Sequence, residues 1–150
     1  MRTVMQLGQR GASLIKWFEK LALVAYRRFP TEPWTAGWGH TGPDVIEGTT
    51  CTPVQADMWF AKDTRQAVAA VNRTLNRVIN QNQFDALVAF TYNVGVDAEA
   101  HSTLIRLVNT GLLKSAANEF LKWNHVDGKE VEGLTHRRLA ERALFTAEVT

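Results

Sequence analysis

One segment of the chain, residues 24–47, constrains the possible folds more than any other part. Side chains that favour strands recur in it, and prolines and glycines interrupt them every few residues. The strand-favouring residues are Tyr26, Phe29, Trp34, Thr35 and Trp38, and the interruptions are Pro30, Pro33, Gly37, Gly39, Gly42 and, directly after the segment, Gly48. This pattern predicts a small antiparallel sheet of two or three short strands.

Helical patterns lie on both sides of this segment. After a loose lead-in over residues 1–12, Ser13 is a candidate N-cap for a helix from Leu14 to about Leu23. Thr52 as cap, Pro53 at the first helical position and Gln55 in a capping box predict a helix to about Leu75. Further helices are expected from the cap Asn82 to Gly95, from the cap Ser102 to Gly111, from about Lys114 to Trp123 and from about Thr135 to Ala147, with a turn at Asp127-Gly128.

This order of elements, with one core expected for 150 residues, predicts a single α+β domain that is mostly helical. The 17 Lys and Arg against 15 Asp and Glu leave a formal net charge of +2, which suits an anionic target such as a cell wall. That charge is too small to predict nucleic-acid binding. A small DNA-binding helical protein remains a remote alternative, which a salt-steep affinity for duplex DNA would reveal.

The single cysteine, Cys51, excludes an intramolecular disulfide and a thiolate metal site. The sequence shows neither the apolar region of a signal peptide nor a run of ~20 apolar residues that would span a membrane. We therefore expect a protein made in the cytoplasm, without stable membrane insertion, and monomeric.

Glu19 is the first candidate for chemistry, because it falls near the end of the first predicted helix and before the glycine-rich segment. Burial disfavours the charged form of a carboxyl group, and a neutral carboxyl can protonate a leaving oxygen, as glycoside hydrolysis requires. The alternative is a solvated glutamate on a surface helix. For Glu19 taken alone, this alternative is favoured.

The run from Trp34 to Thr41 alternates aromatic residues with glycines. Aromatic faces stack on sugar rings and glycines let a backbone approach a ligand, so the run is a candidate lining of a sugar cleft. A hairpin with aromatic core packing explains the pattern equally well. His40 has no second His or Cys at ligand spacing, so we expect no metal and a structural histidine bonded to a carboxylate.

Three arginines, Arg137, Arg138 and Arg142, form a basic cluster in the last predicted helix. Arg138 and Arg142 share a helix face and could contact an anionic wall polymer or a phosphate. A solvated helix face paired with Glu141 is the favoured interpretation.

Several motifs, in the same order along the chain, resemble the T4-type phage lysozymes and especially the endolysins of lambdoid phages. They are WFE at 17–19, AY at 25–26, WTAGWGHTG at 34–42, QNQFDAL at 81–87, FTYNVG at 90–95, STL at 102–104, FLKWN at 120–124 and GLTHRRLAER at 133–142. The resemblance covers about residues 12–146. It implies a lysozyme-like fold with a small lobe that holds the antiparallel sheet and a helical lobe.

The resemblance also implies a peptidoglycan hydrolase without a cofactor. Such an enzyme cuts the β-1,4 bond between N-acetylmuramic acid and N-acetylglucosamine during phage-mediated lysis, and reaches the wall after membrane disruption. Glu19 falls on the catalytic Glu of the family, the general acid, and Thr35 falls on its catalytic Thr. The substrate-binding residues that the resemblance implies are Trp38, His40, Tyr92, Asn93 and Arg137.

The middle position of the family motif departs from the pattern. The motif is a Glu, eight residues, an Asp or sometimes a Cys, five residues and a Thr, whereas here Arg28 follows the eight residues and six separate it from Thr35. An arginine neither acts as a base nor stabilises an oxocarbenium-like charge. In one outcome, a turn at a proline of this longer loop brings Glu32 into the role of the missing carboxylate.

In the other outcome no carboxylate faces Glu19, and Arg28 either points to solvent or holds Glu19 ionised. The sequence favours this second outcome, because Pro33 stiffens the chain beside Glu32. The protein would then be a catalytically impaired member that binds the cell wall without cutting it. A lysis assay separates this alternative from an active muramidase.

Overall fold

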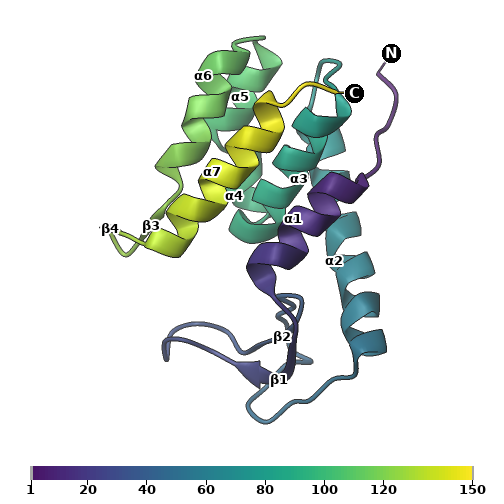
Figure 1. Ribbon diagram of the computed structural model, residues 1–150, viewed down its shortest axis with the longest axis vertical. Helices are drawn as coiled ribbons and strands as arrows, with labels where there is room; N and C mark the ends of the chain where they lie inside the picture. Colours follow the sequence, from purple (N-terminus) through teal and green to yellow (C-terminus); the bar gives the residue numbers. More distant parts are fainter. Residues whose placement is uncertain (1, 150) are drawn as a thin grey trace. The chain divides into compact units, whose positions relative to one another are not determined.

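The computed structural model describes residues 2–149, and the contacts within it divide the chain into two compact units. The sheet unit is Ile15–Arg65, and the helical unit is the chain up to Leu14 together with the chain from Gln66 onward. Two helices, α1 (Gln9–Glu19) and α2 (Pro53–Thr74), begin in one unit and end in the other (Figure 1).

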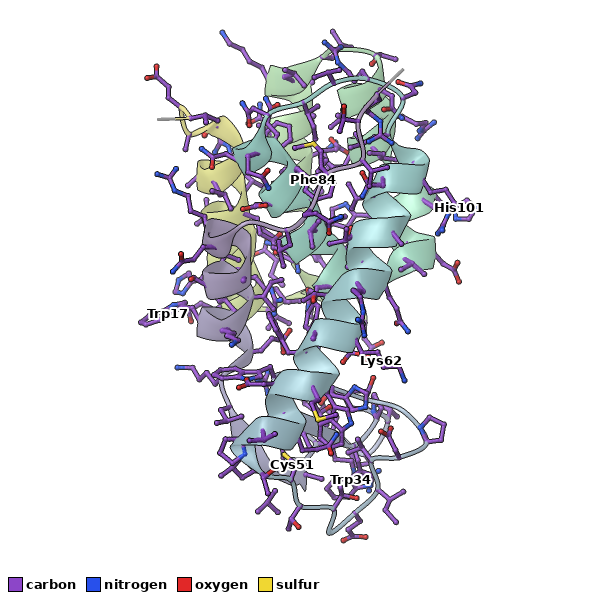
Figure 2. All side chains as sticks on the ribbon, turned by 90° about the vertical axis from the view of Figure 1, so that its right-hand side faces the viewer. Trp17, Trp34, Cys51, Lys62, Phe84 and His101 are labelled. Carbon is purple, nitrogen blue, oxygen red and sulfur yellow. The ribbon has the colours of Figure 1, made fainter. Side chains whose placement is uncertain are left out.

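The helical unit is built around α3 (Gln81–Val94), which is buried without interruption from Phe84 to Thr91. A helix that is covered on all sides forms the centre of a core, and Figure 2 shows Phe84 among the helices of this unit. The helix α7 (Glu132–Thr146) packs along α3 (Figure 1). The remaining elements are α4 (Val96–Ala100), α5 (Thr103–Asn109), α6 (Leu113–Glu119) and the 3-10 turn η1 (Phe120–Lys122).

Several predicted local signals are present in the structure. The Thr52 hydroxyl accepts a hydrogen bond from the backbone N–H of Gln55 at 3.1 Å, and α2 ends one residue before the expected Leu75. Ser102 caps α5 in the same way. The turn at residues 127–128 joins the short strands β3 (His125–Val126) and β4 (Lys129–Glu130).

Other helix bounds differ from the prediction, and α3 shows the reason. Its N-cap is Asn80 and not Asn82, because the side chains of Asn80 and Gln83 each accept the backbone N–H of the other. Asn82 is buried instead, and its amide donates to the carbonyls of Ala147 and Glu148. Likewise α7 starts three residues before the expected position, and α4, a helix of a single turn, was not predicted.

The first helix begins five residues earlier and ends four residues earlier than expected, so the predicted lead-in is partly helical. The expected cap, Ser13, lies inside α1. The cap comes from a distant residue, because the buried Asp85 carboxylate accepts the N–H groups of Gly8 and Gly11 at 2.9 and 3.1 Å. At the other end, Lys20 adopts a left-handed φ of 59° and stops the helix.

The sheet unit contains the antiparallel pair β1 (Ala22–Tyr26) and β2 (Thr35–Gly37), which confirms the small sheet and the mostly helical α+β class. Its register places Tyr26 opposite Thr35. Further bridges join Val24 to Thr50 and Ala36 to His40. Among the described helices, none combines the length and the apolar character needed to cross a bilayer.

Candidate active site

Glu19 is the last residue of α1, four residues before the predicted end of this helix, and its side chain is half-buried. Two backbone hydrogen bonds between Ala36 and His40, of 2.8 and 3.0 Å, close a tight turn that contains Gly39. Gly39 has a φ of +83°, and a Cβ at this position would overlap Oε1 of Glu19. Glycine suits this position for its backbone conformation, and a larger residue would displace the Glu19 carboxyl group from its place.

Glu32 lies in the loop between β1 and β2, in a β-turn closed by its own N–H and the carbonyl of Phe29 at 3.0 Å. Pro30 occupies the second position of this turn, where its fixed φ is favourable. The Glu32 carboxylate folds back and Oε2 accepts the backbone N–H of Arg28 at 3.0 Å. The side chain of Arg28 is exposed to solvent, while its backbone N–H donates to the Glu32 carboxylate.

Two contacts of Arg27 brace the same loop. Its guanidinium donates to the carbonyl of Pro30 at 3.0 Å and lies over the ring of Trp34, 4.6 Å from the ring centre (Trp34 is labelled in Figure 2). The Thr35 hydroxyl donates to the carbonyl of Pro33 at 3.1 Å. These contacts order the loop between β1 and β2.

Tyr26 lies at the end of β1, opposite Thr35, and the pKa of its phenol responds to the charged groups around it. Its own burial raises the pKa of the Tyr26 phenol, and the negative charge of Glu19 raises this pKa further. Arg28 lowers the pKa and Glu32 raises it. Tyr26 is thus within electrostatic reach of both carboxylates.

His40 is held by two carboxylates, as expected of a structural histidine. Its Nδ1 is 2.6 Å from Asp63 and its Nε2 is 3.1 Å from Asp44. The imidazole stacks on Trp59, with ring centres 4.5 Å apart, and is only 5% exposed. The hydrogen bond from His40 lowers the pKa of Asp44.

Trp38 is half-buried in the turn before Gly39. Its indole N–H donates to Asp57 at 3.0 Å, and the ammonium of Lys16 lies 4.9 Å from its ring centre. These contacts fix the plane of the indole ring.

The remaining candidates lie in the helical unit, and the solvated face expected for Arg137 and Arg138 is wrong. Both arginines are buried, and the fully buried Glu141 pairs with them at 3.5 and 2.9 Å. Arg138 also donates to the side chain of Asn93, which is exposed. Tyr92 is half-buried against the core. Burial raises the pKa of Glu141 to about 7, although both guanidinium groups act to lower it.

The structure gathers three of the predicted residues, Glu19, Glu32 and Thr35, around the β1–β2 hairpin of the sheet unit. It adds Tyr26, which sequence reasoning did not single out. Its place opposite Thr35 follows from the pairing of β1 with β2, for which the sequence offered no signal of register. Within residues 2–149, no cluster of three or more His, Cys, Asp or Glu is arranged to hold a metal ion.

Comparisons with known proteins show similarity over nearly the whole chain. The family model described as "Phage lysozyme" matches residues 16–141. The endolysin of Bacillus phage PZA is 45% identical over 144 residues, which are 95% of this chain and 56% of that protein. This chain therefore spans about half the length of that curated relative.

Two solved structures have the same fold over almost their full length. The endolysin from Escherichia coli O157:H7 phage FAHEc1 has a TM-score of 0.87 and 36% identity, and the match covers 99% of this chain and 98% of that one. The muramidase domain of SpmX from Asticaccaulis excentricus has a TM-score of 0.85 and 35% identity, with 95% and 99% covered.

Proposed function

Since the chain belongs to the phage lysozyme family, we propose that it hydrolyses the glycan strands of bacterial peptidoglycan. The bond cut is the β-1,4 link between N-acetylmuramic acid and N-acetylglucosamine. The observation that carries the proposal is the position of Glu19, a half-buried carboxyl group against the backbone of Gly39. Its neighbours Tyr26 and Thr35 form the rest of this site.

In this reaction Glu19 acts as the general acid. Its proton passes to the glycosidic oxygen while the bond from that oxygen to C1 breaks, and the electron pair stays on the oxygen. Water supplies the new oxygen at C1. The indole of Trp38, which its contacts with Asp57 and Lys16 hold in place, is a candidate surface for a sugar ring.

The setting of the reaction is also part of the proposal. The protein acts as a monomer on the cell wall of a phage-infected bacterium and reaches the wall from the cytoplasm once the membrane is disrupted. Support comes from the similar proteins described as endolysins. Fractionation of cells before and after membrane permeabilisation tests it, because protein found with the wall of intact cells would contradict this order of events.

The test of Glu19 is the substitution Glu19→Gln, which keeps the shape of the side chain and removes the transferable proton. General acid catalysis contributes about 10²–10⁴-fold, so lysis of chloroform-treated Gram-negative cells should fall at least that much while the melting curve is retained. Glu47→Gln is the matched control, since Glu47 is exposed in the same unit. Near-native lysis by Glu19→Gln would overturn the proposed role.

One observation favours a second candidate function, a wall-binding protein that does not cut. By the resemblance of the sequence motif, Arg28 falls where an Asp or a Cys is expected. Sedimentation with purified peptidoglycan, combined with an assay for new reducing ends, separates the two. Binding without reducing ends would establish the silent protein.

A further inference from the structure

We propose that Glu32 supplies the second catalytic carboxylate of this site. Its loop folds back so that this carboxylate lies beside the backbone N–H of Arg28. The proposal rests on the proposed hydrolysis and names the group that acts on the attacking water. The sheet unit has a half-buried carboxyl group in Glu19, whereas the side chain at position 28 is an exposed arginine and offers no second carboxylate.

The first argument is the path of the loop. Glu32 lies three residues before Thr35. Its carboxylate can point back toward the end of β1 only if the chain turns between β1 and Glu32. The structure has this turn at Phe29 to Glu32, with Pro30 in its second position. Proline sets φ in advance at this position, which lowers the entropy that the chain loses when it forms the turn.

The second argument is the anchor of the carboxylate. Oε2 of Glu32 accepts the N–H of Arg28 at 3.0 Å, so the group lies beside the backbone from which the side chain of residue 28 leaves the chain. A carboxylate has about four acceptor sites, and a single N–H bond leaves capacity to hold a water molecule. The bond also fixes the orientation of the side chain before any substrate binds.

The third argument is the set of charges around the hairpin. The negative charges of Glu19 and of Glu32 both raise the pKa of the Tyr26 phenol. Two cations belong to the same loop. Arg28 lowers the pKa of Tyr26, although its side chain is exposed. Arg27 lies over the ring of Trp34 and donates to the Pro30 carbonyl, so it is held on the loop itself.

The chemistry requires only water in addition to the glycan. Glu19 gives its proton to the glycosidic oxygen, and the bond between this oxygen and C1 breaks with its electron pair on the oxygen. The water oxygen bonds to C1 and its proton passes to the Glu32 carboxylate. Solvent then returns a proton to Glu19 and removes one from Glu32, so that one water is consumed for each bond cut.

The central experiment compares Glu32→Gln with the unmodified protein on purified peptidoglycan, with new reducing ends measured as a function of pH. Glutamine retains an oxygen that accepts the Arg28 N–H, so the loop is preserved while the base is lost. We expect kcat to fall about 10²-fold or more with KM changed little, and the acidic limb of the pH profile to disappear. Added azide, an anion that replaces the activated water, should restore part of the turnover.

Two further variants test the position of the carboxylate. In the Glu32→Gln background, Arg28→Asp places a carboxylate on the same backbone position and should recover part of the lost kcat. Glu32→Asp keeps the charge but is one methylene shorter and should give an intermediate rate. Glu47→Gln, the matched control, should behave as the unmodified protein does.

The outcomes distinguish this proposal from the proposed function. If the unmodified protein cuts peptidoglycan and Glu32→Gln stays within threefold of it, Glu32 is not catalytic and the hydrolase assignment stands. A loss of kcat that azide and Arg28→Asp leave unchanged, with a lowered melting temperature, would assign Glu32 a structural role only. If the unmodified protein releases no reducing ends, both proposals fail.

Discussion

His40 illustrates at the scale of a residue how a polar side chain can be buried at little cost. Both ring nitrogens face carboxylates, and the ring face is covered by Trp59. Asp63 is itself partly buried, whereas Asp44 is exposed to solvent. Such a group stabilises the unit around it, because buried polar atoms without partners are costly.

We predict that His40→Asn lowers stability more than it lowers activity per folded molecule. Asparagine cannot reach both carboxylates and loses the stacking on Trp59, which should cost about 2 kcal/mol of unfolding free energy. Urea denaturation and a lysis assay corrected for the folded fraction provide the two measurements. A loss of activity at unchanged unfolding free energy would instead give His40 a direct role.

Glu99 is a second buried residue, with a different consequence. The Thr74 hydroxyl donates to its carboxylate at 2.8 Å and is also 3.1 Å from the carbonyl of Ala70. The single proton of the Thr74 hydroxyl cannot fully serve both the Ala70 carbonyl and the Glu99 carboxylate. A protonated Glu99 could donate its own proton to the Thr74 oxygen and leave the Thr74 proton for Ala70. Burial raises the pKa of Glu99, while the Thr74 bond and the charge of Arg73 lower it.

A pH dependence of stability follows from this direction. Because the folded pKa of Glu99 lies above its ordinary value of 4.5, the folded protein binds more protons than the unfolded chain just above that pH. The stabilisation is complete below 4.5 and is lost as the pH rises through the folded value. We predict that the unfolding free energy of Glu99→Gln, measured in urea from about pH 4 to 8, rises relative to the parent as pH increases. Glu130→Gln should show no such trend, and a constant difference would contradict the prediction.

At the scale of elements, the start of α1 depends on a carboxylate from α3. Asp85 accepts hydrogen bonds from the N–H groups of Gly8 and Gly11 and from the side chain of Gln81 at 2.7 Å. A Cβ at Gly11 would overlap Asp85, so the glycine permits the close approach of the two helices. This contact stabilises a helix that has no cap of its own.

We predict that Asp85→Ala destabilises the protein by about 3 kcal/mol, because it leaves buried N–H groups without an acceptor. The loss should appear in urea denaturation and as faster hydrogen exchange over residues 9–14. Asp97→Ala removes an exposed carboxylate and is the comparison. A cost below about 0.5 kcal/mol would mean that water replaces the cap.

At the scale of the whole molecule, the two units differ in how much apolar surface they bury. In the part of the chain that the structure describes, most fully buried apolar side chains belong to the helical unit, around α3. The sheet unit contributes small ones for the most part, Ile15, Ala36, Val45 and Ala56. Local stability follows buried apolar contact, so the units should open at different free energies.

We predict that backbone amides of β1 and β2 exchange with solvent at least tenfold faster than those of α3, because the sheet unit opens without global unfolding. Native-state hydrogen exchange followed by mass spectrometry measures this directly. Equal protection in both units would show instead that the molecule unfolds as a single cooperative body.

The sequence by itself determined the elements whose signals are local. The helix starts at Thr52 and Ser102 and the turn at Asp127 were predicted correctly, because each depends on bonds within three or four residues. The end of α1 at Glu19 was placed only approximately, although the residue itself was identified. The mostly helical α+β class followed from the order of these elements.

Only the tertiary structure decided the rest, because burial and distant partners are properties of packing. The cap of α1 is Asp85, more than seventy residues away in sequence. Arg137 and Arg138 are buried together with their partner Glu141, although the same pattern on an isolated helix would be solvated. Pro33 indicated a stiff loop but could not show where Glu32 points. That direction is set by the turn from Phe29 to Glu32 and by the bond from the Arg28 N–H, two local contacts that were considered from the sequence but not favoured.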